Sequence, residues 1–338
     1  NGECFSGVQP EDLAGQWSMP PIPFCTPWAR GWVEETAEGT RLIYSGAHPD
    51  TTERSRLENV GFGRPAFDGS AIYLPVLNAR DTNEVNVYKH DFKEREPKSK
   101  TRNFIRPSFR PQTSPVRGEG FLAFLQETGK EKNRVYIADD GGDSYPCAQN
   151  GNEDSHGSLT ASGPWVAWLE NPPTDRCANI VLTKASTCGD IINQARWDLS
   201  GTVVGREPGQ PALHGSKDAL IWLESTQSCR DRLSSEAGTE IKAWFYTRPE
   251  RPATLKIKPE LVGAPIEIVG APQHGVFAVI TWSRGPKGLY LVDLETGKSR
   301  QIETRGQIAH PHLSQQYLIW TEYALDDGNW EVRYEKLP

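Results

Sequence analysis

A short apolar run recurs six times along this chain, and this repeat limits the folds that the chain can adopt. The copies are SAIYLPV from Ser70, GFLAFLQE from Gly120, PWVAWLE from Pro164, DALIWLES from Asp218, VFAVITWS from Val276 and QYLIWTEY from Gln316. One point of the run is occupied in turn by Leu74, Phe124, Trp168, Trp222, Trp282 and Trp320. A constant local pattern at variable spacing predicts one structural unit repeated with loops of different length.

Each run has a partner segment on either side. A segment of small and polar residues, often with a proline, precedes it, as in GQPAL, and an alternating strand follows it, as in EIKAWFYTR. Four short strands in series at a repeat of about 40–60 residues are typical of propeller blades. The runs are apolar on both faces because each blade is covered by its two neighbours. The 31 glycines and 26 prolines supply the many turns that such a fold needs.

We therefore predict an all-β fold, a six-bladed β-propeller, with seven blades if residues 17–60 form a divergent one. The last unit ends at Pro338 after its third strand. A spare strand, Thr40–Gly46, precedes the first full unit, and we expect it to join the last blade and close the ring without a free edge. In domain terms, residues 1–39 are a proline-rich arm pinned by a disulfide, and residues 40–338 are one propeller domain.

The cysteine pattern indicates disulfide bonds rather than a zinc or redox motif. The chain has an even number of cysteines and no CxxC pair: Cys4, Cys25, Cys147, Cys177, Cys188 and Cys229. We expect Cys4–Cys25 to pin the N-terminal arm and the other four to join neighbouring loops. Because the chain also starts at Asn1, we predict a processed N-terminus and a secreted, periplasmic or cell-surface location. The alternative is six buried thiols in a cytosolic protein.

Charge and hydropathy exclude some classes of function. The net charge of −7, with acids and bases mixed, argues against general nucleic-acid binding, which requires a basic surface. No apolar run approaches the roughly 18–20 residues of a membrane-spanning helix. The sequence also lacks GxSxG, HExxH and a glycine-rich phosphate loop.

Polar residues just before the first strand of each unit form a candidate ligand site. In a propeller this strand lines the central channel, so the residues at its start meet at one mouth. The aligned positions are Arg64, Arg106, His156, Gln210, Ala271 and His310. Arginine binds carboxylate or phosphate through its planar fork, so this channel face suits an anionic ligand. The alternative is a set of ordinary polar groups around a water-filled channel.

The repeat pattern resembles TolB-like six-bladed propellers. The last unit, HPHLSQQYLIWTEYALDDGNWEVRYEKL, is similar to repeats of bacterial and archaeal secreted propellers of that group, and the resemblance runs from Gly61 onward. It implies the fold and leaves the function open, because the shared motifs are structural.

Gln307-x-x-His310-x-His312 is a candidate metal site. Imidazoles two residues apart on a strand point the same way, and with an amide oxygen they can hold Mn²⁺, Ca²⁺ or Zn²⁺. The spacing is similar to the QxxHxH of oligogalacturonate lyases, a propeller family. That resemblance implies manganese on Gln307, His310, His312 and a fourth histidine, His274 or His214. It also implies a basic residue that abstracts a proton beside a uronate carboxylate, with Arg64, Arg106 or His156 as the catalytic candidates. The alternative is that His312 packs in the core.

Two functions remain open at this stage. The first is a propeller that binds a protein partner or an anionic glycan at its channel face without catalysis, as a subunit or scaffold. The second is a carbohydrate-active enzyme, a metal-assisted lyase or a hydrolase, that acts on an acidic glycan.

Overall fold

A computed structural model gives the fold of this chain. It describes residues 14–15, 17, 19–36, 39–46, 65–77, 84–94, 101–129, 132–147, 155–171, 177–204, 212–231, 238–248, 250–257, 265–271, 274–281, 288–314, 316–324 and 328–337. Within these residues the elements are β-strands, apart from two single-turn 3₁₀ segments, Ala185–Thr187 and Ile191–Asn193. None of the described segments forms a helix of the length and apolarity that crossing a membrane requires.

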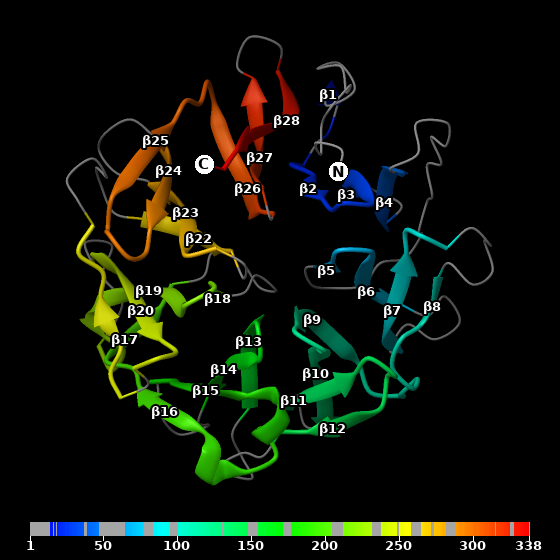
Figure 1. Cartoon of the computed structure of the whole chain (residues 1–338), viewed down its shortest axis with the longest axis vertical. Coiled ribbons are helices and arrows are strands. Elements are labelled where there is room, and N and C mark those ends of the chain that lie inside the picture. The colour runs from blue at the N-terminus through cyan, green and yellow to red at the C-terminus, as the bar shows by residue number, and fades with distance from the viewer. Residues whose placement is uncertain are drawn as a thin grey trace.

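Seven antiparallel sheets stand around a common axis, so the described chain is an all-β propeller of seven blades (Figure 1). The first three blades are β2 (Ile22–Cys25), β3 (Ala29–Thr36) and β4 (Gly39–Gly46); β5 (Ala66–Asp68), β6 (Ala71–Leu77), β7 (Val85–Asp91) and β8 (Thr101–Asn103); and β9 (Gln112–Gly118), β10 (Phe121–Gly129), β11 (Lys132–Asp139) and β12 (Ser144–Pro146).

The remaining blades follow the same plan. The fourth and fifth are β13 (Ser155–Ser162), β14 (Trp165–Asn171), β15 (Asn179–Lys184) and β16 (Ala195–Asp198); and β17 (Gly201–Val203), β18 (Leu213–Gly215), β19 (Ala219–Ser228), β20 (Thr239–Phe245) and β21 (Ala253–Thr254). The sixth and seventh are β22 (Pro265–Gly270), β23 (Val276–Thr281), β24 (Gly288–Asp293) and β25 (Ser299–Ile302); and β26 (Gln307–Leu313), β27 (Tyr317–Ala324), β28 (Asn329–Lys336) and β1 (Ala14–Gly15).

The count of six blades is corrected to seven, and the divergent unit within residues 17–60 is the additional blade. Its strands β2, β3 and β4 form a sheet of their own, in which Trp32 pairs with Pro23 on one side and Ile43 on the other. Strands β2 and β3 lie in the segment 1–39 that we assigned to an arm, and β3 pairs with β4 across that boundary.

The ring is closed by a strand from the N-terminal region, as predicted, but by a different one. Residues 40–46 belong to β4 and pair with β3 inside the first blade. The closing strand is β1, which pairs with the outer strand of the last blade, Ala14 opposite Glu331 and Gly15 opposite Trp330. A two-residue strand held by backbone pairing carries no side-chain pattern. The sequence therefore favoured the longer apolar segment, residues 40–46, as the closing strand.

The core consists of layers between blades. Seven buried apolar clusters are found among the described residues, and each joins residues of two adjacent blades. The repeat positions Leu74, Phe124, Trp168, Trp222 and Trp320 are all buried, with exposed fractions between 0% and 4%. Trp282 lies outside the described residues. Burial of these side chains supplies the main driving force that holds neighbouring blades together.

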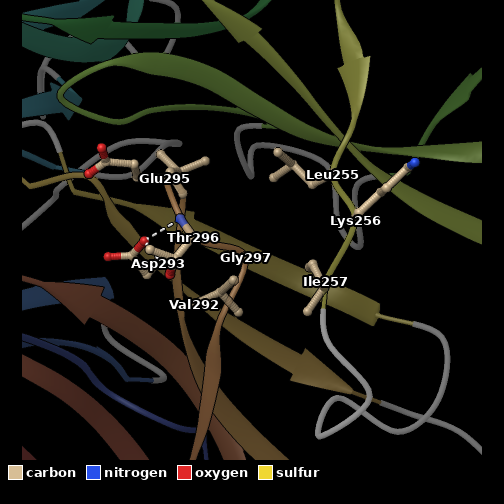
Figure 2. A pocket seen from close by; sticks show the side chains of 9 residues that line it. Leu255, Lys256, Ile257, Val292, Asp293, Glu295, Thr296 and Gly297 are labelled. Carbon is tan, nitrogen blue, oxygen red and sulfur yellow. Dashed lines mark hydrogen bonds between the residues drawn. The ribbon is translucent and has the colours of Figure 1, made fainter.

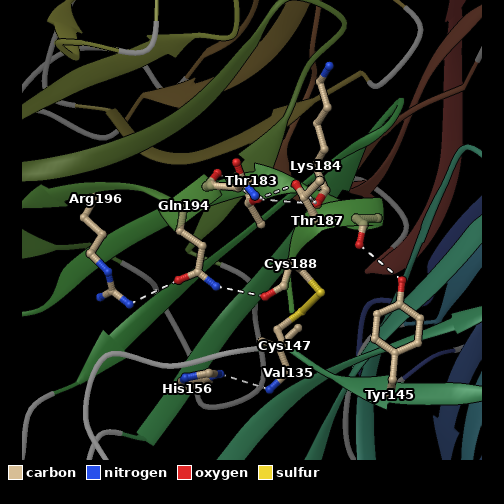
Figure 3. The surroundings of a disulfide bond; sticks show 12 residues. Val135, Tyr145, Cys147, His156, Thr183, Lys184, Thr187, Cys188, Gln194 and Arg196 are labelled. Carbon is tan, nitrogen blue, oxygen red and sulfur yellow. Dashed lines mark hydrogen bonds between the residues drawn. A yellow bond between two sulfur atoms is a disulfide. The ribbon is translucent and has the colours of Figure 1, made fainter. Parts of the chain in front are cut away.

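Two disulfides join loops of adjacent blades. Cys147, just after β12, bonds Cys188 between β15 and β16 (Figure 3). Cys177, before β15, bonds Cys229 after β19. The expectation that these four cysteines join neighbouring loops is confirmed. Cys4 lies outside the described residues, so its pairing with Cys25 stays a prediction.

Candidate functional site

The first strands of three blades carry the same β-bulge, and this bulge changes the alignment of the candidate ring. Residues Ser114, Ser158 and His310 each have a positive φ, between 45° and 50°. Each begins a two-residue bulge opposite the recurring aromatic position of its blade, Phe124, Trp168 or Trp320. His310 is therefore equivalent to Ser114 and Ser158.

In the sequence, the segment with Pro107 resembles the segment with Pro311 of the last unit. In the structure, Pro115 is the residue equivalent to Pro311, because these two prolines occupy the second position of their bulges. Arg106 accordingly lies six positions before Gln112, at the exposed start of the segment that leads to β9. Ala271 is buried after β22, and Arg64 and Gln210 lie outside the described residues.

His156 is the ring residue whose surroundings are best defined. It is 1% exposed on β13, and its Nδ1 accepts a hydrogen bond from the Val135 N–H at 3.0 Å. Its Nε2 therefore carries the proton and lies 3.7 Å from Oε1 of Glu170. Glu170 is fully buried and forms a two-pronged ion pair with Arg196, whose Nη2 also donates to Oε1 of Gln194 at 3.2 Å (Figure 3).

Burial, and then the positive charges of Arg134 and Arg196, lower the pKa of His156 from 6.5 to about 3. The imidazole is thus neutral at physiological pH and adds no positive charge to the channel mouth. Its buried position and its hydrogen bond to Val135 give it the role of a structural residue between blades.

We predict that His156 makes the fold acid-sensitive. The folded-state pKa lies below that of the unfolded chain, so the unfolded state binds more protons between about pH 3 and 6.5. The free energy of unfolding therefore falls as the pH falls through this window, by at most about 1.4 kcal/mol per pH unit. His156→Gln keeps an acceptor for the Val135 N–H and does not titrate. Its free energy of unfolding, measured by urea unfolding at several pH values between about 4 and 6, should therefore depend less steeply on pH than that of the wild type. Parallel slopes for the two proteins would contradict the prediction.

The residues of the candidate metal motif are distributed along β26. Gln307 is exposed at the start of the strand, opposite Tyr323, and His310 lies in the bulge with a φ of 49°. The bulge interrupts the alternation of side chains on which the motif depended. His312 is half-buried in the inner strand. Its ring and the Phe67 ring of β5 form an edge-to-face pair with their centroids 5.6 Å apart.

The two candidates for a fourth ligand lie on other blades. His274 is in the turn between β22 and β23, and His214 is on β18 opposite Ile221. Across the part of the chain that the structure describes, no three His, Cys, Asp or Glu side chains gather as a metal site would require. The metal set of Gln307, His310, His312 and a fourth histidine therefore stays a prediction, and no reaction step is derived through a metal.

A second repeated feature, the buried glutamate, was missed in the sequence. Four tryptophans are followed two residues later by a glutamate, in the segments WVE, WLE, WLE and WTE. The four carboxylates are buried, with exposed fractions of 9%, 0%, 3% and 3% for Glu34, Glu170, Glu224 and Glu322. The recurrence of Trp-x-Glu is the signal that would have found them.

Two of these glutamates hold the backbone where a first strand begins. Glu224 accepts a hydrogen bond from Gly201 N–H at 2.8 Å, and Glu322 accepts one from Gly306 N–H at 2.6 Å. A Cβ at Gly201 or Gly306 would lie within about 2 Å of a backbone oxygen of the next strand, so both positions require glycine. These two buried carboxylates therefore have a structural role.

A basic loop connects β8 to β9 and leads from the outer edge of one blade to the channel strand of the next (Figure 1). Residues 101–118 contain four arginines and no aspartate or glutamate. Three of the arginines, Arg102, Arg106 and Arg110, are exposed, and Phe109 among them is 91% exposed. We call these four residues the basic loop surface. Within the described residues none of its arginines forms an ion pair.

The backbone of this loop is held by buried polar side chains. Asn86 Oδ1 accepts from Ser108 N–H at 2.9 Å, and Gln112 donates from Nε2 to the Arg106 carbonyl at 3.3 Å. Asn86 and Gln112 are 4% and 1% exposed. The loop is therefore fixed from below while its arginines and Phe109 face water.

A cavity of about 210 Å³ lies away from this surface, between the fifth and sixth blades (Figure 2). Leu255, Lys256 and Ile257 after β21 form one wall, and residues 292–297 around the β24–β25 turn form the other. Asp293 Oδ1 accepts hydrogen bonds from the amide and hydroxyl of Thr296, at 2.7 and 2.8 Å, which stabilises the turn.

Comparison with known proteins gives the fold. No protein-family model and no curated protein sequence matches the chain. Among solved structures, a prolyl endopeptidase matches 95% of this chain and 46% of its own, with a TM-score of 0.59 and 14% identity. The β-propeller domain of the trilobed protease from Pyrococcus furiosus matches over 95% and 97%, with a TM-score of 0.58 and 11% identity.

An oligogalacturonate lyase in complex with manganese is similar over 96% of this chain and 98% of its own, with a TM-score of 0.55 and 11% identity. The chain spans about half the length of the prolyl endopeptidase and of a prolyl oligopeptidase B, 46% and 48%. At such identities these likenesses show the propeller fold alone. The Pyrococcus propeller is described as having an open velcro topology, whereas β1 pairs with β28 in this chain.

Proposed function

We propose that this propeller binds a negatively charged partner at the basic loop surface. The observation that carries the proposal is the exposure of three arginines without an acidic neighbour in the loop, on a backbone held by Asn86 and Gln112. Arg110 donates from Nη1 to the Thr128 carbonyl at 2.7 Å, and none of the three guanidinium groups forms an ion pair within the described chain. Their remaining N–H groups can therefore pair with carboxylate or sulfate groups of a ligand.

The position and the charge of the whole chain support the same proposal. The loop ends at Gln112, where β9, the first strand of its blade, begins, and the start of this strand is where we expected an anionic ligand. The chain has a net charge of −7, so attraction of an anion is confined to a local basic surface. The β10–β11 hairpin adjoins this surface through the hydrogen bond from Arg110 to the Thr128 carbonyl, and it carries Lys132 and Arg134 together with Glu127 in its sequence. The two interblade disulfides support a location outside the reducing cytosol.

The test compares two variants with the same change in net charge. Arg106→Gln/Arg110→Gln should weaken binding of polygalacturonate and poly-glutamate about tenfold at low salt, since each exposed ion pair contributes roughly 0.7 kcal/mol. Arg248→Gln/Arg251→Gln, at exposed sites near β21, should bind like the wild type. Binding is measured by isothermal titration calorimetry at two salt concentrations. Equal affinities for both variants, or no binding to either polymer, would contradict the proposal.

A carbohydrate-active enzyme that acts on an acidic glycan is the second candidate, because the exposed arginines of the basic loop surface suit uronate carboxylates as well. In that case the basic loop surface faces the uronate carboxylates of the substrate. The polygalacturonate arm of the experiment tests this candidate as well, because lysis creates an unsaturated uronate that absorbs in the ultraviolet. A rise in absorbance that Arg106→Gln/Arg110→Gln abolishes would assign the enzyme.

A further inference from the structure

Phe109 lies at the tip of the basic loop surface in a conformation that the loop maintains. Pro107 and Pro111 restrict the backbone on either side of it, since proline fixes φ. Ser108 N–H donates to Asn86, and Arg110 N–H donates to Ser108 Oγ at 3.1 Å. The phenyl ring is therefore 91% exposed on a loop whose backbone is held in place by these hydrogen bonds and prolines, which we call a braced loop.

An exposed phenyl ring on a braced loop is well suited to act as an interface anchor. Aromatic and arginine side chains dominate the binding energy of protein interfaces, and loops that are already ordered lose less entropy on binding. Ile105, close before the tip, is buried in the underlying core at 2% exposure and fixes the base of the loop. The loop thus presents one exposed apolar group that lies between Arg106 and Arg110 in the chain.

The chemistry of the tip favours a polypeptide over a glycan or a small molecule. A phenyl ring has no polar edge to bind hydroxyl groups, and the cavity described above lies on other blades. Phe109 requires apolar groups that cover it, and Arg106 and Arg110 require carboxylates beside those groups. An acidic polypeptide segment with interspersed apolar side chains supplies both.

We infer that Phe109 anchors a protein interface and that the partner presents an acidic segment whose apolar side chains cover this ring. The inference rests on the proposed function, because the carboxylates are those that the arginines attract. It adds the class of partner and the residue on which specificity depends.

The test is a selection of random displayed peptides on the wild-type protein, followed by affinity measurement on variants. Peptides that combine Asp or Glu with Leu, Phe or Trp should be enriched, and Phe109→Ser should weaken them about thirtyfold, as loss of an interface anchor does. Ile192→Ser is the matched control, because Ile192 is also 91% exposed but lies on the β15–β16 connection. It should leave the affinities unchanged.

The outcomes separate this inference from the proposed function. Selected peptides that bind Phe109→Ser as tightly as wild type but lose affinity for Arg106→Gln/Arg110→Gln would overturn the anchor and keep the anionic partner. Peptides that depend on Phe109 and not on the arginines would keep an apolar anchor and overturn the anionic partner. Polygalacturonate binding without any enriched peptide would overturn the polypeptide partner. An unchanged thermal midpoint of Phe109→Ser shows that the fold is intact.

Discussion

Glu170→Ala should destabilise the propeller by about 3–5 kcal/mol, the cost of removing one partner from a buried ion pair. Glu170 is fully buried between Arg196, which donates to both of its oxygens, and His156, whose Nε2 lies 3.7 Å away. The alanine variant leaves the Arg196 guanidinium with only the amide oxygen of Gln194 among these groups. Urea unfolding followed by tryptophan fluorescence measures the loss of stability. Trp168 reports on this cluster, because the centroids of its ring and of the His156 ring are 5.4 Å apart.

Two variants separate the buried charge from other effects. Glu170→Gln keeps an oxygen that accepts from Arg196, so its loss should be smaller than that of Glu170→Ala. Glu240→Ala removes a carboxylate that is 43% exposed and pairs with Lys242 at 2.8 Å. Water screens that pair, so the loss should stay below about 1 kcal/mol. If Glu170→Ala cost no more than Glu240→Ala, the buried cluster would have no structural role.

Removal of the Cys177–Cys229 disulfide should lower the free energy of unfolding by about 4 kcal/mol at most. The two cysteines are 52 residues apart, and the chain-entropy relation gives about 4 kcal/mol for a loop of that length. The bond joins a loop of the fourth blade to a loop of the fifth blade. Without it, the segment between the two cysteines has more conformations in the unfolded chain, which favours unfolding. Urea unfolding of Cys177→Ser/Cys229→Ser against wild type, both without reductant, measures the effect.

A second double variant of the same two cysteines provides the control. Cys229 is 6% exposed, so Cys177→Ala/Cys229→Ala tests whether the serine hydroxyl adds a burial cost of its own. Both double variants should unfold at lower urea than wild type, and dithiothreitol should reduce the difference by destabilising the wild type. Equal midpoints for wild type and both variants would show that this disulfide leaves the folding equilibrium unchanged.

The blades were predictable because each one repeats a local pattern. Trp168, Trp222 and Trp320 mark the second strand of their blades, and burial on both faces required apolar residues on both faces. The first blade was harder to recognise because its strand β3 carries Glu34 and Glu35 and reads as polar. Its Trp32-x-Glu34 pattern links it to the others, and Glu34 is satisfied by the indole N–H groups of Trp17 and Trp32 at 2.8 and 3.0 Å.

The candidate site was predicted less well because it depends on register. A bulge adds one residue to a strand and reverses the side-chain alternation beyond it. His310 occupies such a bulge, so neither the ring of six positions nor the Gln307, His310 and His312 set follows from counting residues. Arg106 was selected for a place in the channel ring, and the structure puts it on an exposed loop beside Phe109.

The sequence by itself determined the repeated four-stranded unit, the apolar interfaces between blades, and a ring joined by a strand from the N-terminal region. These follow from local hydrophobic patterning, which each unit carries within its own residues. Only the tertiary structure decided the seventh blade, the strand β1 that closes the ring, the burial of His156 and the exposure of Phe109. Backbone pairing and the position of a side chain relative to other blades depend on contacts between residues far apart in the chain, and no short stretch of sequence encodes them.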